Sequence, residues 1–350
     1  MYGLLVILGV VTLVFFLFNI LPGDPARMML GQRADEESIK MINRDLGRDK
    51  PVGTQFLGYL NDLFPISVHN NSDPESYWYL DKEKYGGYAT LIKMGHTSVV
   101  AKAPYLRRSY QTKRKVTDVI ATAFPQTAVL ALTAMSFALV VGILLGILAA
   151  IYKDTWIDRL TLLLSTLGMS LPSFFAAILM AWFFAYVLSD VTHLNMFGNL
   201  YSVDDYGCGE HVDLRNLILP ALTLGIRPLA VLVQLTKNSM LEALSQDYIR
   251  TARAKGMKRS RVIFRHALRN AMNPVVTSAS GWLAGLLAGA VFVEYVFDWK
   301  GMGVVIVDGL EKYDFPVVMG AILFVCVLLV VINIVVDIIY GLLDPRVRLT

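Results

Sequence analysis

Apolar runs long enough to cross a membrane dominate this chain. Tyr2 to Leu21 is twenty residues without a charge, which as a helix covers about 30 Å of hydrocarbon. Mean hydropathy is +0.53 and only 17% of the residues are charged, against about 25% in soluble domains. The sequence therefore predicts an all-α polytopic membrane protein with six transmembrane helices. The predicted spans are residues 2–21, 124–151, 160–188, 217–236, 275–297 and 315–342.

The first apolar run has an alternative interpretation as a signal peptide. No basic segment precedes it, and no small-residue cleavage site lies before Pro22-Gly23-Asp24-Pro25. We therefore expect a retained first span.

A basic stretch sets the predicted topology. Between Lys237 and Arg269 there are nine basic residues and two acidic ones, and such an excess marks a cytoplasmic loop. Alternating six spans around this loop places both termini in the cytoplasm and residues 22–123 outside it. The formal net charge of +4 arises mostly from this loop, so we do not interpret it as a nucleic-acid-binding surface.

Within this loop the pattern predicts a helix, a tight turn and a second helix. Asp247 lies at the opening turn, Gly256 ends the first helix, and Ser260 can cap the second. Small residues at Ala252 and Ala254 would leave one helix face nearly bare, so that its backbone could press into a groove on another protein. The alternative is a solvated basic tether between two spans.

The segment DYIRTARAKGMKRSRVIFRHALRNAMNPVV resembles the coupling loop of bacterial binding-protein-dependent ABC importer permeases, in the form of the dipeptide, oligopeptide and nickel branch. NILPGDPA, from Asn19, resembles the exit of that family's first span, and the segment 297–320 resembles its last external loop. The resemblance covers about residues 8–62 and 104–345. Two positions depart from the general motif: Arg250 stands where it begins with Glu, and Arg269 where it has Pro.

The resemblance implies the type I ABC importer permease fold, with a cytoplasmic coupling helix, and the role of a B-type permease subunit. Its implied partners are a homologous C-type permease subunit, two cytoplasmic ABC ATPase subunits, an extracytoplasmic peptide-binding protein and membrane lipid. The residues that would couple to the ATPase are Ile249, Arg250, Ala252, Arg253, Lys255, Gly256 and Met257.

No enzyme chemistry is evident in the sequence. It has no GxxxxGK[ST] loop for nucleotide phosphates, no HExxH and no GxSxG. We expect no cofactor on this chain, with ATP and Mg used by the partner ATPases. Cys208, Glu210, His211 and His193 lack any established ligand spacing, so no metal site is predicted. Cys208 and Cys326 fall on an outer loop and in the last span, so we expect no disulfide.

Polar residues and prolines inside the spans are candidates for the translocation pathway. Pro172 should break the third span between Ser170 and Ser173, and Arg227 and Gln234 lie in or near the fourth span, which Pro220 and Pro228 should interrupt. A purely structural kink, or an arginine that snorkels or pairs, explains the same residues. Two glycine stripes predict close helix packing: Gly142 and Gly146, and Gly281, Gly285 and Gly289.

Residues 64–103 have no counterpart in the family and are interpreted as a large extracytoplasmic insertion. Tyr77, Trp78 and Tyr79 could face a ligand or partner there, or form an aromatic belt or small local core. The predicted domains are thus residues 1–21, 22–123, a permease core of 124–345 containing the loop 237–273, and a tail of 346–350.

Two other functional classes remain open from the residues alone. A secondary transporter or channel would need titratable groups at depth, for which only Arg227 and Asp337 are candidates, and no clear internal repeat is present. A membrane scaffold could use the basic loop for lipid or partner contacts. Genes for two ATPases and a second permease beside this one would exclude both. Within the resembling family the substrate stays open among dipeptides, longer peptides, nickel complexes and sugars.

Overall fold

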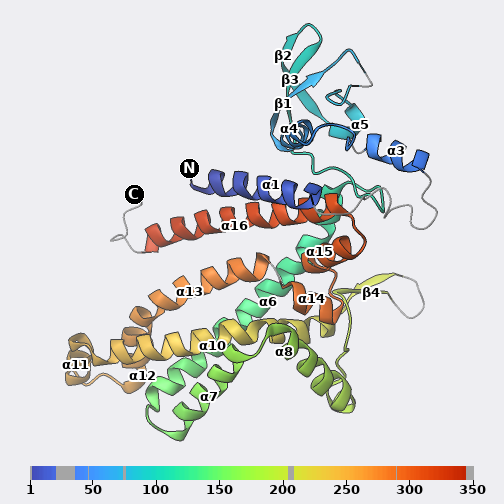
Figure 1. Ribbon diagram of the computed structural model, residues 1–350. Helices are drawn as coiled ribbons and strands as arrows, with labels where there is room; N and C mark the ends of the chain where they lie inside the picture. The colour runs from blue at the N-terminus through green and yellow to red at the C-terminus, as the bar shows by residue number, and fades with distance from the viewer. Residues whose placement is uncertain are drawn as a thin grey trace. The chain divides into compact units, whose positions relative to one another are not determined.

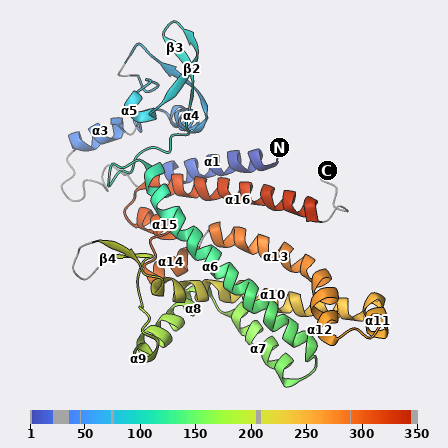
Figure 2. The ribbon, with the colours of Figure 1, turned by 180° about the vertical axis from the view of Figure 1, so that it is seen from behind.

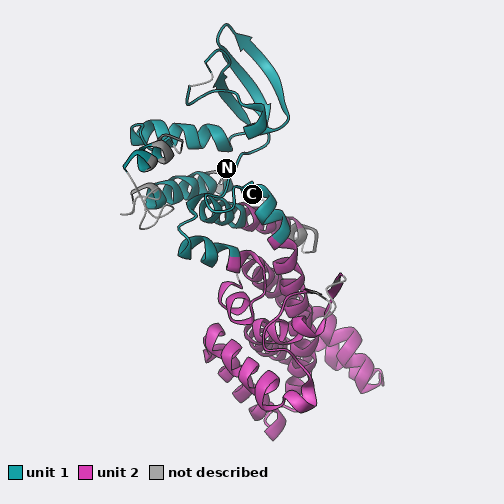
Figure 3. Cartoon of the chain, turned by 90° about the vertical axis from the view of Figure 1, so that its right-hand side faces the viewer, with its two compact units in different colours: residues 1–122, 305–326 teal, residues 123–304, 327–350 magenta. Residues whose placement is uncertain are grey.

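The chain folds into two compact units, which are described separately (Figure 3). The computed structural model describes residues 2–20, 36–45, 47–73, 76–203, 209–288 and 290–343. The first unit contains residues 1–122 and 305–326, and the second contains residues 123–304 and 327–350. Three helices contribute to both units: α6 (Val116–Ile151), α15 (Met302–Glu311) and α16 (Phe315–Leu343).

In the first unit, helix α1 (Tyr2–Ile20) lies along the first half of α16 (Figures 1 and 2). Phe15 is almost fully buried against α4, with its ring 5.6 Å from that of Tyr59, and Phe18 meets Phe315 at 5.5 Å. This apolar packing joins the first helix to the beginning of the last one. The remaining helices of this unit are α3 (Glu36–Asp45), α4 (Val52–Leu63) and α5 (Lys82–Tyr85).

The segment 64–103 forms a three-stranded antiparallel sheet of order β1-β3-β2. Its strands are β1 (Ile66–Asn70), β2 (Tyr88–Met94) and β3 (Thr97–Lys102). Ser98, Val100 and Lys102 alternate with more exposed residues along β3, which is the period of a half-buried strand. Gly95, at φ +56°, closes the turn between β2 and β3. The expected all-α fold is therefore wrong for this segment.

In the second unit, helix α10 (Arg215–Ser245) is the central element. It packs against α7 (Trp156–Ser170), α8 (Ser173–Met180), α13 (Leu268–Ala288) and α14 (Val291–Phe297). A buried apolar cluster including Leu130, Leu219, Leu232, Val275 and Trp299 fills the space between these helices. The smaller elements are η2 (Ala181–Val187), α9 (Ser189–Thr192), β4 (Tyr201–Val203), β5 (Glu210–Val212), α11 (Asp247–Ala254), α12 (Arg259–Arg261) and η3 (Val262–Ala267).

Three helices are long and apolar enough to cross a membrane by length and composition: Val116–Ile151, Arg215–Ser245 and Phe315–Ile338. Two bent pairs qualify as broken spans or re-entrant loops, α7 with α8 at 110° and residues 259–287 with α14 at 55°. Within α1, the segment Leu5–Phe18 counts as a shorter apolar helix. These segments correspond to the six expected spans, whose number stays a prediction.

Prolines behave differently in the third and fourth predicted spans. The break between α7 and α8 falls at Leu171 and Pro172, as predicted, because proline cannot donate the backbone hydrogen bond that would continue the helix. The expected interruption at Pro220 and Pro228 is wrong, since α10 runs through both. Helix α6 also begins earlier than expected, at Val116, and contains Pro125.

Candidate functional site

The basic loop is a short helix followed by a tight turn. α10 ends at Ser245, α11 follows after one residue, and the chain turns at Gly256 before α12. Gly256 has φ +71°, a left-handed conformation that glycine adopts without steric cost. Its amide donates to the Arg253 carbonyl oxygen at 3.0 Å, which closes the last turn of α11. The predicted turn is therefore present, whereas Lys258, not Ser260, occupies the N-cap position of α12.

One side of α11 packs into the second unit itself. Ile249 is 0% exposed and Ala252 is 4% exposed. They belong to a buried cluster with residues of α6, α10, η3 and α13, namely Ile147, Ala150, Met240, Ala243, Val262, Ile263, Ala267 and Ala271, with Met257 packed at its edge. The expectation that Ile249 and Ala252 lie on an outward docking face is wrong, because their apolar surface is covered by this cluster.

The outward side of α11 carries charge and small residues. The side chains of Arg250 and Asp247 are 79% and 91% exposed and meet at 3.3 Å. Arg253, Ala254 and Lys255 are exposed, as is Gly256. A Cβ atom built on Gly256 would meet nothing within 4 Å. The buried side thus fixes the helix, and the exposed side is open to a partner.

A buried ion pair joins α10 to α7, near the start of the basic loop. Lys237 Nζ is 2.5 Å from Asp158 Oδ1, with side-chain exposures of 11% and 6%. Asp158 also accepts a hydrogen bond from the Asp154 amide at 3.1 Å. It therefore ties the turn before α7 to α10. In the sequence Lys237 is one of the loop's nine positive charges, and an aspartate within an apolar helix was the available signal that one of them has a buried partner.

The two glycine stripes have different surroundings. A Cβ atom on Gly146 would lie 2.6 Å from Thr236 Cβ and 2.8 Å from the Val233 carbonyl oxygen, so α6 approaches α10 closely there. At Gly142 the nearest atom is Leu232 Cβ at 3.1 Å. Gly281 and Gly285 are exposed with nothing within 4 Å, and Gly289 lies outside the described residues.

The four pathway candidates occupy two elements. Ser170 and Ser173 flank the break between α7 and α8, and the Ser170 hydroxyl donates to the Thr166 carbonyl oxygen at 2.8 Å. Arg227 is exposed and Gln234 half-buried on α10. Within the described ranges, no hydrogen bond joins any two of these four side chains, so their role in a pathway stays a prediction.

A buried polar cluster that the sequence did not reveal holds the turn after α14. Glu294 is fully buried and accepts hydrogen bonds from the Thr127 hydroxyl at 2.7 Å and the Gly303 amide at 2.6 Å. Trp299 Nε1 donates to the Gln126 carbonyl oxygen at 3.1 Å. Gly303 has no room for a side chain, because a Cβ atom would lie 2.5 Å from Val291 Cα. The glycines of the segment 300–303 were the available signal of such a close approach.

Among the residues that the structure describes, no three His, Cys, Asp or Glu side chains lie together as a metal site requires. His193 and His211 are described, whereas Cys208 lies outside the described residues. Cys326, in α16, is a free thiol.

Sequence comparison identifies the family. The profile described as "Binding-protein-dependent transport system inner membrane component" matches residues 142–349, and the profile of the corresponding N-terminal region matches residues 1–74. The Di/tripeptide transport system permease protein DppB of Pseudomonas aeruginosa (strain UCBPP-PA14) is 35% identical over 97% of this chain and 94% of its own length.

Two relatives from Escherichia coli (strain K12) agree over similar lengths. The Glutathione transport system permease protein GsiC is 33% identical over 99% of this chain and 96% of its own length. The Probable D,D-dipeptide transport system permease protein DdpB is 34% identical over 98% and 94%.

The same fold occurs in a solved structure. The MetNI methionine ABC transporter, in an inward facing conformation, matches with a TM-score of 0.51 and 16% identity over 65% of this chain and 97% of that one. At this identity the likeness bears on the fold alone, which is the permease fold of an ABC importer. The chain belongs to the family of binding-protein-dependent transport system inner membrane components.

Proposed function

We propose that this chain forms the translocation path of an ABC importer for di- or oligopeptides, delivered by an extracytoplasmic binding protein and driven by separate ATPase subunits. The observation that carries the proposal is its 33–35% identity, over nearly its whole length, to permeases named for di/tripeptide, D,D-dipeptide and glutathione transport. A partner permease of the C type would complete the path. This chain would bind no cofactor, and the partner ATPases would use ATP and Mg.

The outward side of α11 is the docking surface for an ATPase subunit. Its support is the division of the helix: Ile249 and Ala252 anchor it in the second unit, while Arg250, Arg253 and Lys255 remain exposed. A helix held rigidly from behind transmits a push to the elements that it packs on, here α6, α10 and η3. ATPase movement would in this way reach the membrane-spanning helices.

The basic surplus of residues 237–269 supports a cytoplasmic position for this loop and both termini. Three proposed crossings then separate it from the three-stranded sheet, which places the sheet outside the cytoplasm. There the sheet would meet the binding protein or its cargo.

The experiment that tests this function is peptide uptake by proteoliposomes that hold the reconstituted complex. We expect uptake to require ATP and both permease subunits. Ala254→Glu, on the exposed side of α11, should abolish uptake and the co-purification of the ATPase, because a carboxylate enters the docking surface. Ala254→Ser, matched in position and nearly in size, should retain both.

Uptake that persists without any ATPase subunit would reject the proposal and favour a secondary transporter. Full activity and ATPase binding in Ala254→Glu would reject the docking surface while leaving the importer assignment intact.

A further inference from the structure

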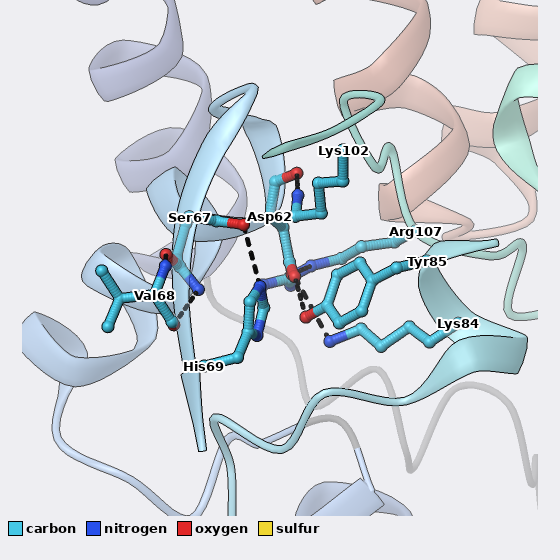
Figure 4. A network of polar contacts seen from close by, with 9 residues as sticks. Asp62, Ser67, Val68, His69, Lys84, Tyr85, Lys102 and Arg107 are labelled. Atoms are coloured by element: carbon cyan, nitrogen blue, oxygen red, sulfur yellow. Dashed lines mark hydrogen bonds and ion pairs between the residues drawn. The ribbon is translucent and has the colours of Figure 1, made fainter. Parts of the chain in front are cut away.

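A buried aspartate in the first unit contacts several basic side chains at once (Figure 4). Asp62, at the end of α4, has a side chain only 7% exposed. Its carboxylate lies 3.2 Å from Lys84 Nζ and 3.2 Å from Arg107 Nε, and accepts a hydrogen bond from the Tyr85 hydroxyl at 2.9 Å. Lys102 Nζ donates to the Asp62 carbonyl oxygen at 2.6 Å. Asp62 thus contacts three basic side chains, two through its carboxylate and one through its backbone carbonyl oxygen.

Burial is the largest cause of the pKa shifts of His69 and Lys102 in this cluster, and neighbouring charges modify them. Burial, with Lys102 and Lys84 acting in the same direction, lowers the pKa of His69 to about 4. Burial also lowers the pKa of Lys102 to about 8, with Lys84 acting in the same direction against Asp62. Burial alone would raise the pKa of Asp62, but Arg107 and Lys84 hold it below its usual range. The carboxylate is therefore ionised and already fully engaged by its partners.

A cavity of about 270 Å³ opens beside this cluster. Four of its lining residues are basic, Lys84, Arg107, Arg108 and Lys113, and Asp62 is the single carboxylate among them. Tyr77, one of the three consecutive aromatic residues 77–79, forms part of the cavity wall. The lining therefore has a net formal charge of about +3, which attracts anions.

The segment 107–113, which supplies three of the basic residues of this cavity, is held in place by hydrogen bonds to Asp314. Arg107 and Lys113 have φ values of 67° and 59°, in the left-handed region that side chains rarely adopt. Between them, the Ser109 hydroxyl donates to the Asp314 carboxylate, and the Tyr110 amide donates to it at 2.9 Å. These bonds fix the loop in a conformation that directs its basic residues to one cavity, which reduces the entropy lost when a ligand binds.

We propose that this cavity binds a carboxylate group, and that its source is the terminal carboxylate of a peptide delivered to the permease. The choice of a peptide as the source rests on the proposed function, whereas the carboxylate chemistry rests on the cavity alone. Arg108 and Lys113 would supply charge-assisted hydrogen bonds to the two carboxylate oxygens. The tyrosines that line the cavity, Tyr77, Tyr105 and Tyr110, would pack against the neighbouring residue of the peptide, for which the cavity has room.

The test is calorimetric titration of the purified full-length chain in detergent at low ionic strength. The probes are dialanine, its C-terminal amide and acetate. We expect dialanine to bind saturably and acetate to compete with it, while the amide binds at least about tenfold more weakly, as loss of a charged hydrogen bond requires. Lys113→Gln should weaken dialanine binding by about tenfold. Lys93→Gln, on the exposed strand β2, should leave it unchanged.

The outcomes separate the site from the proposed function. Equal affinity for dialanine and its amide, or an unchanged affinity in Lys113→Gln, would overturn the carboxylate site. If acetate binds saturably but dialanine does not bind, the peptide is not the source of the carboxylate. That result would point instead to an acidic side chain of the binding protein. If dialanine binds as expected but the wild-type complex imports no peptide, the proposed function fails and the site stands.

Discussion

Asp158 and Lys237 form an ion pair with almost no access to solvent, and each is a charge that the surrounding apolar helices cannot solvate. In Asp158→Asn, Lys237 would remain buried without its counter-charge. We expect this variant to lose about 3–5 kcal/mol of stability, the usual effect of removing one partner of a buried pair. Thermal unfolding of the purified chain in detergent measures this loss.

The double variant Asp158→Leu with Lys237→Met is the control, since it removes both charges together. It should recover most of the lost stability, because apolar side chains of similar volume replace a desolvated pair at little cost. If both variants unfold at the wild-type temperature, the pair does not stabilise α7 against α10. If both lose the same stability, the loss does not come from leaving Lys237 unpaired.

His69 makes the three-stranded sheet sensitive to acid. The side chain is 1% exposed, its Nε2 lies 2.9 Å from the Ser67 hydroxyl, and its pKa is lowered from 6.5 to about 4. Between these pH values the unfolded chain binds a proton that the folded sheet does not, so stability falls as the pH falls. The loss by pH 4 is up to about 3 kcal/mol.

Hydrogen exchange of the β1 and β3 amides, corrected for the intrinsic effect of pH, measures this dependence. His69→Phe should remove it between pH 6.5 and 4, because phenylalanine keeps the ring contact with Tyr85 but takes up no proton. His96→Asn, at an exposed position in the turn between β2 and β3, should retain it. An identical pH dependence in all three chains would contradict the assignment to His69.

At the scale of elements, the contact between α6 and α10 depends on Gly146. In Gly146→Ala the new methyl group would lie 2.6 Å from Thr236 Cβ, so the helices must separate. We expect a loss of about 1–3 kcal/mol in thermal unfolding. Gly281→Ala is the matched control, a helical glycine with nothing within 4 Å, and should be neutral or stabilising by up to about 1 kcal/mol. Equal effects of the two substitutions would argue against close packing at Gly146.

The turn after α11 depends on the backbone of Gly256 rather than on free space. At φ +71° a branched side chain is strained, so Gly256→Val should destabilise α11 by about 1–2 kcal/mol, seen as faster exchange of its amides. Gly256→Asn, whose side chain tolerates this conformation, should exchange nearly as the wild type does. Faster exchange in Gly256→Asn to the same extent would show that the side chain, not the backbone conformation, matters.

The sequence allowed the apolar helices, the break at Pro172 and the turn at Gly256 to be predicted, because each depends on local chemistry. The direction in which the apolar face of α11 points could not be predicted from the sequence. Ile249 and Ala252 form a small apolar face that suits either the chain's own core or a partner's groove, and only the surrounding elements decide between them. The sheet was missed since its strands are short and separated by polar residues. The Asp62 cluster was missed because its cations come from distant positions, Lys84, Lys102 and Arg107.

At the scale of the whole molecule, the bent pair of α7 and α8 decides how often the chain crosses the membrane. Its 110° angle fits either a broken span or a re-entrant loop. If α6, the bent pair and α10 each cross once, three crossings separate the sheet from the basic loop, and the two lie on opposite sides. If the bent pair returns to its own side, only two crossings remain, and both segments lie on the same side.

Labelling of single cysteines distinguishes these topologies. In a chain with Cys208 and Cys326 replaced by serine, Lys82→Cys reports the sheet segment and Lys258→Cys the basic loop, and both positions are exposed. We expect a membrane-impermeant maleimide to label Lys82→Cys in cells whose inner membrane is intact, and Lys258→Cys only after that membrane is permeabilised, because an excess of nine basic over two acidic residues favours the cytoplasmic side. Labelling of both from outside would make α7 and α8 a re-entrant loop and remove the ATPase-docking role of α11, since that helix would then lie on the wrong side of the membrane.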